Sequence, residues 1–219
     1  FGVKQRAKLW QKNLRPPHVL VMTATPIPRT LAMTVYGDLD VSIIDELPPG
    51  RKPITTRHYS QYNRHRIREG VISELRRGRQ VYIVYPLIEE NERLDLLALE
   101  EGYENTIRDY PEWRVGKIHG KMKPAEKEAA MRDFSEGKTH ILVSTTVIEV
   151  GVNVPNASVM IIENAERFGL AQLHQMRGRV GRSSRRGYAY FTFARGKELT
   201  DIAQRRLEAI REYTEFGSG

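Results

Sequence analysis

Short apolar runs alternate along the chain with longer stretches in which apolar residues recur at helical spacing. The apolar runs are typical of buried strands, and they cover residues 18–22, 54–59, 80–87, 113–118, 140–146, 158–162 and 187–193. The helical stretches cover residues 1–13, 29–36, 63–77, 89–109, 123–134, 170–175 and 197–215. Glycine follows several of the predicted helices, such as Gly78 and Gly137, and is a helix terminator. Alternating strands and helices predict an α/β fold built on a parallel sheet.

Polar residues follow the predicted strands at several points. They are Thr23 and Thr25 after the first strand, and His119 and Gly120 after residues 113–118. Thr145 and Thr146 stand at the end of the strand predicted at 140–146, with Gly151 and Asn153 beyond it. Parallel sheets bind ligands at the carboxyl ends of their strands, so these residues are predicted ligand contacts. The alternative for the threonines is a structural hydroxyl bonded to the backbone, and for His119 a structural histidine.

A fourth candidate site is an arginine and glycine cluster at the end of a predicted helix, over residues 175–182. Helical spacing of Leu170, Leu173 and Met176 would bury one face of that helix and hold the arginines at one point. Planar guanidinium groups suit phosphate oxygens, so the cluster predicts phosphate recognition. The alternative is a solvated basic turn, the usual reading of a basic run. We group it with the three strand-end sites.

Composition narrows the class of protein. The 219 residues carry a formal net charge of +8, which favours a polyanionic partner such as nucleic acid. They include no apolar run near the ~20 residues of a membrane span. The absence of cysteine excludes disulfides and thiolate chemistry and fits a reducing compartment. Without a secretory signal pattern, we expect a soluble, cytoplasmic protein with no membrane partner.

Two segments imitate parts of a nucleotide-hydrolysis site. Gly137-Lys138-Thr139 resembles the end of a phosphate loop, but Arg132 stands where the loop requires glycine, and the tripeptide precedes a strand. Asp45 and Glu46 resemble a metal-binding strand end, yet prolines follow directly. The chain therefore lacks the phosphate loop and the Mg²⁺-binding acid of phosphoryl transfer. We predict no metal site and no complete ATPase.

The order and spacing of the four sites resemble the conserved blocks of superfamily 2 helicases. In that resemblance Thr23-Ala-Thr25 couples hydrolysis to strand movement, and Gly151 and Asn153 join it as ATP-binding or coupling residues. His119, Gly120, Thr145 and Thr146 are implied nucleic-acid contacts. Arg179 and Arg182 become catalytic arginine fingers, with Gln175 positioned nearby. The stretches 23–31, 36–40 and 45–53 are similar to those of helicases that migrate DNA branch points.

The resemblance covers nearly the whole chain and implies a RecA-like sheet with helices on both faces. Its implied domains are the tail of a first RecA-like domain and a linker over 1–50, the second RecA-like domain over 51–195, and the start of a truncated translocation hairpin over 196–219. The implied cofactors are ATP and Mg²⁺, held mainly by the first domain. The implied partners are branched double-stranded DNA and the first RecA-like and wedge domains, which are expected to precede Phe1.

Other functions remain open from the residues alone. The motor of transcription-repair coupling factor is related, although residues 45–53 favour the branch-migrating helicases. A non-enzymatic nucleic-acid-binding domain of helicase shape is a second alternative. Asn153 stands where many helicases carry an acid, and the chain stops within the region similar to the hairpin. We therefore expect translocation by the isolated polypeptide to be impaired. Because the phosphate loop and the Mg²⁺-binding acid are absent, we also expect it to be inactive as an ATPase.

Overall fold

The structure is a computed structural model that describes residues 52–60, 63–87, 92–145, 154–182 and 184–193. It also describes single positions at 20, 22, 42, 49, 50, 201, 204, 205, 208 and 209. The chain separates into two compact units, Phe1–Val41 and Ser42–Gly219. The fold reported below is that of the second unit. The segments predicted at 1–13 and 29–36 lie outside the described residues.

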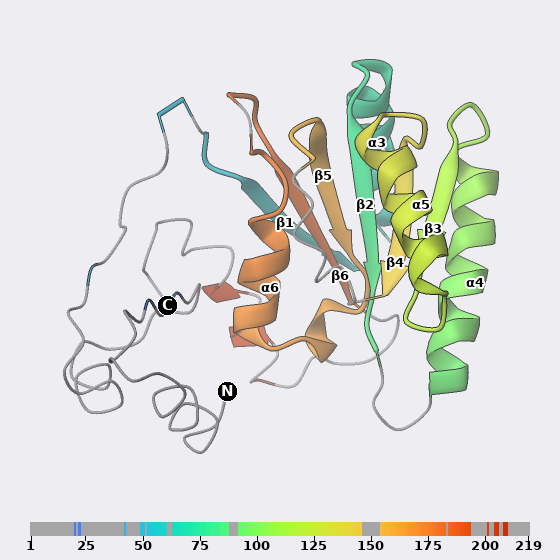
Figure 1. The fold of residues 1–219 in the computed structure, drawn as a ribbon. Coiled ribbons are helices and arrows are strands. Elements are labelled where there is room, and N and C mark those ends of the chain that lie inside the picture. Colours follow the sequence, from blue (N-terminus) through green and yellow to red (C-terminus); the bar gives the residue numbers. More distant parts are fainter. Residues whose placement is uncertain are drawn as a thin grey trace, which may run out of the picture. The chain divides into compact units, whose positions relative to one another are not determined.

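A parallel sheet forms the centre of the second unit (Figure 1). Its strands are β1 (Thr55–Ser60), β2 (Gln80–Tyr85), β3 (Val115–Ile118), β4 (Ile141–Thr145), β5 (Ala157–Ile162) and β6 (Tyr188–Phe193). They form a 6-stranded sheet in the order β1-β6-β5-β2-β4-β3, and every pair of neighbours is parallel. Because β2, β4 and β5 are interior strands covered on both faces, their sequences are continuous apolar runs rather than alternating ones.

Helices cover both faces of the sheet (Figure 1). They are α3 (Arg64–Arg76), α4 (Glu92–Asp109), α5 (Pro124–Ser135) and α6 (Leu170–Arg177), with a 3₁₀ turn, η2 (Ala165–Arg167), between β5 and α6. One buried cluster contains side chains of α3 and α4, and the other contains side chains of α5 and α6. The predicted three-layer α/β architecture is therefore confirmed.

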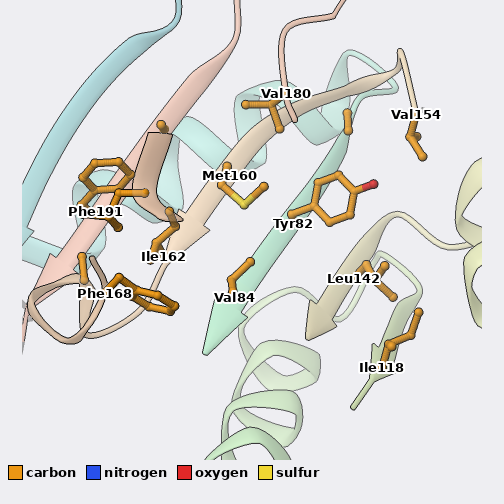
Figure 2. Close-up of a cluster of buried hydrophobic side chains, with 14 of the residues drawn as sticks. Tyr82, Val84, Ile118, Leu142, Val154, Met160, Ile162, Phe168, Val180 and Phe191 are labelled. Carbon is orange, nitrogen blue, oxygen red and sulfur yellow. The ribbon is translucent and has the colours of Figure 1, made fainter. Parts of the chain in front are cut away.

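The core on the α5 and α6 face centres on β2 and β5 (Figure 2). Tyr82 and Val84 point to this face, together with Met160 and Ile162. The Tyr82 ring lies 4.7 Å from the ring of Phe134 in an edge-to-face arrangement, a favoured geometry for aromatic pairs. Tyr82 is 2% exposed and is therefore an aromatic residue of the core.

Most predicted boundaries are confirmed to within a few residues. Pro124 occupies the first turn of α5, and the Glu126 carboxylate accepts a hydrogen bond of 2.8 Å from the Lys123 backbone N–H. Gly78 and Gly137 end α3 and α5 with φ angles of +73° and +76°, which glycine adopts without steric cost. The positions described within predicted helix 197–215 are helical.

One predicted boundary differs from the structure, and one helix contains an interior glycine. The strand predicted from Trp113 begins at Val115, because residues 111–113 form a turn in which the Trp113 ring packs against Tyr110. Gly102 lies in the middle of α4, although glycine disfavours helix interiors. A Cβ there would collide with the Tyr85 hydroxyl. The missing side chain therefore lets α4 approach the sheet.

Candidate functional site

The arginine cluster forms a defined turn at the end of α6, which we call the arginine loop (residues 178–182). The Gly178 N–H donates to the His174 carbonyl at 3.0 Å, and the Arg179 N–H donates to the Met176 carbonyl at 3.0 Å. Arg182 Nε donates to the Gly178 carbonyl at 3.1 Å. A cation on the last carbonyls of a helix stabilises the negative end of its dipole. The Arg182 guanidinium is thus oriented by the helix it follows.

The arginine loop is anchored to the sheet through its next residues. Val180 is fully buried, and the Gly181 N–H donates to the carbonyl of Ala157, the first residue of β5, at 3.3 Å. Gly181 has a φ of +65°, and a Cβ on it would lie 3.1 Å from both Cα and N of Gly187. The loop is therefore held by a backbone contact that excludes side chains.

This anchoring corrects one expectation. The arginine cluster was grouped with sites at the carboxyl ends of strands, but Gly181 lies beside the first residue of β5. A helix that connects parallel strands must run back across the sheet, so α6 begins near the carboxyl edge and ends near the amino edge. The arginine loop and the strand-end residues therefore lie at opposite edges of the sheet.

The positive charges of Arg179 and Arg182 both lower the pKa of the buried Tyr82 hydroxyl. Burial raises the pKa of Tyr82 to about 12, and the charges of Arg179 and Arg182 oppose that rise. Both guanidinium groups therefore lie near one point on the α6 face of the sheet. Arg179 is half-buried and Arg182 is exposed, while Gln175 is exposed on α6 one turn before Arg179. Two cations and an amide at one helix end can bind phosphate oxygens.

The second group of predicted residues meets at the carboxyl edge of β3 and β4. These strands are neighbours, with Ile118 opposite Ser144, so His119 follows β3 beside Thr145 at the end of β4. Thr145 is 2% exposed, and its hydroxyl has no hydrogen-bond partner within the described residues. The His119 Nδ1 atom is likewise buried without a partner there. Unmatched buried polar atoms indicate a place where a ligand completes the bonding.

Charged groups surround His119 and fix the backbone that follows it. Burial lowers the pKa of His119; the charge of Glu100 opposes this effect, and the charge of Lys117 adds to it. Lys127 on α5 donates from Nζ to the Gly120 carbonyl at 2.7 Å, which holds the exposed turn after β3. At neutral pH His119 is therefore an uncharged polar group at the edge of the sheet.

Five of the predicted site residues lie outside the described part of the chain: Thr23, Thr25, Thr146, Gly151 and Asn153. The described residues thus form two groups. The first contains Gln175, Arg179 and Arg182, and the second contains His119, Gly120 and Thr145. No described cluster of three or more histidine or acidic side chains could hold a metal ion. Within the same residues, no helix is both long and apolar enough to cross a membrane.

Arg177 and Glu163 are buried charges that the sequence analysis missed. Arg177, the last residue of α6, is 9% exposed, and its Nη2 atom lies 3.1 Å from Nδ1 of His174. Its position four residues after Leu173 continues the buried stripe and could have signalled burial. Glu163 follows β5 and forms an ion pair of 2.8 Å with Arg64. No local pattern connects that pair, because the partners lie far apart in sequence.

The strand order, the helix layers and the loop after α6 define a RecA-like domain of the helicase type. The chain belongs to the helicase conserved C-terminal domain family, whose family model matches residues 64–184.

The chain is also similar to proteins named ATP-dependent DNA helicase RecG. The protein from Synechocystis sp. is 60% identical over 189 residues, which are 86% of this chain and 23% of that protein. The protein from Escherichia coli strain K12 is 53% identical over an alignment 219 residues long, which covers 97% of this chain and 31% of that protein. A solved structure of RecG bound to a three-way DNA junction has a TM-score of 0.70 and 44% identity, covering 87% of this chain and 26% of that one. The chain thus spans less than a third of the length of these relatives.

Proposed function

We propose that the chain is the C-terminal motor domain of an ATP-dependent DNA helicase that remodels branched DNA in recombination and repair. Its family, and its identity with proteins named RecG, support this function. The solved relative bound to a three-way junction supports branched double-stranded DNA as the partner. A DNA substrate also favours the cytoplasm as the site of action. As the resemblance implies, residues 1–50 would be the tail of a first RecA-like domain and a linker. Residues 51–195 would be the second RecA-like domain, and residues 196–219 the start of a translocation hairpin.

In this proposal the arginine loop contacts ATP. The cationic ends of Arg179 and Arg182 fit the oxygens of a triphosphate, and Gln175 lies one turn before Arg179, on α6. Arginines brought to a transferring phosphoryl group stabilise the charge that develops on it. Mg²⁺ would be held mainly by the first RecA-like domain, as the resemblance implies. Gly151, Asn153, Thr23 and Thr25 are the proposed residues of ATP binding and coupling.

Nucleic acid would bind at the other edge of the sheet. We assign this contact to His119, Gly120, Thr145 and Thr146. The unmatched Thr145 hydroxyl and His119 Nδ1 atom are suited to donate to, or accept from, a sugar-phosphate backbone. Contacts of this kind position a strand without reading its sequence. The two edges would then bind different ligands, with the sheet between them transmitting force.

One observation carries the proposal: a helix end orients Arg182, and the charges of Arg179 and Arg182 both act on Tyr82, in a sequence that contains no phosphate loop. Such a site is half of a nucleotide-binding cleft, completed by a first RecA-like domain. We therefore expect the 219-residue chain to hydrolyse no ATP, with or without branched DNA. A phosphate-release assay tests this. ATP turnover that Arg179→Ala abolishes in the isolated chain would contradict the half-site.

A further inference from the structure

His174 and Arg177 on α6 form a contact that determines the protonation state of the histidine. Arg177 Nη2 lies 3.1 Å from His174 Nδ1. A guanidinium group has only donors, so a hydrogen bond between these atoms requires a lone pair on Nδ1. His174 must then be neutral, and its proton must lie on Nε2.

The contact between His174 and Arg177 lies in the last turn of α6, immediately before the arginine loop. Arg177 is the last residue of α6 and is 9% exposed. The backbone carbonyl of His174 accepts from the Gly178 N–H at 3.0 Å, and the Gly178 carbonyl in turn accepts from Arg182 Nε at 3.1 Å. The imidazole, the buried guanidinium and the exposed Arg182 are therefore linked through one helix end.

We propose that His174 is a positioning residue whose neutral imidazole holds the buried Arg177 guanidinium, so that protonation of His174 disturbs the arginine loop. A proton on Nδ1 would place two donors, and two positive charges, against each other. The last turn of α6 would then lose the side-chain contact between His174 and Arg177. The consequence for ATP hydrolysis rests on the proposed function, but the state of His174 does not.

The electrostatic surroundings agree with this arrangement. Burial lowers the pKa of His174, and the charge of Arg177 lowers it further; no carboxylate in the described part of the chain opposes them. Burial also lowers the pKa of Arg177. Because the folded pKa of His174 lies below the unfolded value of 6.5, its contribution to stability is complete above pH 6.5. That contribution is lost as the pH falls through the folded pKa.

Nuclear magnetic resonance on the 219-residue chain tests the state of His174. Long-range ¹H–¹⁵N spectra distinguish the two neutral tautomers, and we expect the Nε2–H form at neutral pH with a midpoint below 6.5. Replacing the cation by an apolar chain of similar length, Arg177→Met, should raise that midpoint. An Nδ1–H tautomer overturns the proposal, and so does a midpoint that Arg177→Met leaves unchanged. If Arg177→Met does not fold, the tautomer of His174 in the wild-type chain alone tests the proposal.

A pH profile of the full-length protein tests the link to hydrolysis. Loss of one proton-sensitive contact should lower kcat by about tenfold for each pH unit below the His174 midpoint. His174→Gln offers an acceptor that does not titrate, so this acid limb should disappear; persistence of the limb overturns the proposal. His65→Gln, an exposed histidine of α3, is the matched control and should keep it. Failure of the proposed function would show separately, as full hydrolysis by Arg179→Ala.

Discussion

Gly181 and Gly187 pack backbone against backbone where the arginine loop meets the start of β6. A Cβ on Gly181 would lie 3.1 Å from Gly187 Cα, and a Cβ on Gly187 would lie 2.9 Å from Gly181 Cα. Neither neighbour is the flexible end of a side chain, so neither contact can be relieved without moving the backbone. The position of Arg182 therefore depends on two residues that have no side chains.

We expect Gly181→Ala to destabilise the chain more than an ordinary glycine substitution. The φ of +65° costs an alanine ~1–2 kcal/mol, and the close contact adds about 1–3 kcal/mol of the kind caused by overpacking. Gly137→Ala is the control, because its φ is +76° and nothing lies within 4 Å of the added Cβ. Urea unfolding measures both. If both variants lose the same free energy of unfolding, the close contact with Gly187 does not add to the cost of Gly181→Ala.

Glu163 links α3 to the turn after β5, and we expect its removal to be costly. Its side chain is 3% exposed, and it pairs with Arg64 at 2.8 Å and accepts from the Thr192 hydroxyl at 2.6 Å. Breaking a buried ion pair costs ~3–5 kcal/mol. Because Arg64 is 42% exposed and can regain water, we expect about 2–3 kcal/mol for Glu163→Ala.

The matched control for that prediction is Glu136→Ala, which breaks the surface ion pair of 2.5 Å with Lys138. Exposed pairs contribute little to stability, so this variant should unfold at nearly the wild-type urea concentration. If Glu163→Ala behaves like Glu136→Ala, the buried pair does not stabilise the junction between α3 and β5.

Thr145→Val should weaken nucleic-acid binding without lowering stability. Its hydroxyl is buried and unmatched within the described residues, so replacing it removes a polar group whose burial is unfavourable. Loss of a hydrogen bond to a charged phosphate costs ~1.5–3 kcal/mol, which is about tenfold or more in Kd. Fluorescence anisotropy with a labelled three-way junction, at low and moderate salt, measures the change. The affinity itself should fall as salt rises.

Ser144→Ala is the control for that experiment. Ser144 precedes Thr145 on β4 and is fully buried with an unmatched hydroxyl, but adjacent side chains on a strand point to opposite faces. We expect unchanged binding for this variant. Equal weakening of binding by both variants, or a much lower melting temperature for Thr145→Val, would argue against a nucleic-acid contact at Thr145.

The elements of the fold could be predicted because they leave local patterns in the sequence. The helix predicted at 123–134 is α5, Pro124–Ser135, since its proline, its apolar stripe and Gly137 are all close neighbours. The apolar run at 140–146 is β4, Ile141–Thr145, and residue 146 is outside the described part. Burial on both faces favours apolar residues at successive positions, and in β4 the apolar run continues to Val143, before Ser144 and Thr145.

Relationships between distant residues could not be predicted in the same way. The pairing of Arg64 with Glu163 and the contact of Gly102 with Tyr85 depend on how the sheet brings separate segments together. The position predicted for the arginine loop, among the sites at the carboxyl ends of strands, was wrong for a different reason. Its glycines and arginines indicated a ligand, but the direction of α6 across the sheet decides which edge they reach.

The most direct test of the account is the DNA-stimulated kcat of Arg179→Ala in the full-length protein, measured on a three-way junction beside its melting temperature. If Arg179 contacts the transferring phosphoryl group, kcat should fall by ~10³–10⁵, and Arg179→Lys should not restore it because lysine lacks the planar fork. The melting temperature should stay close to that of the wild type, since the half-buried Arg179 lies outside the core. Hydrolysis at the wild-type rate, or a loss of activity accompanied by unfolding, would contradict the proposed role.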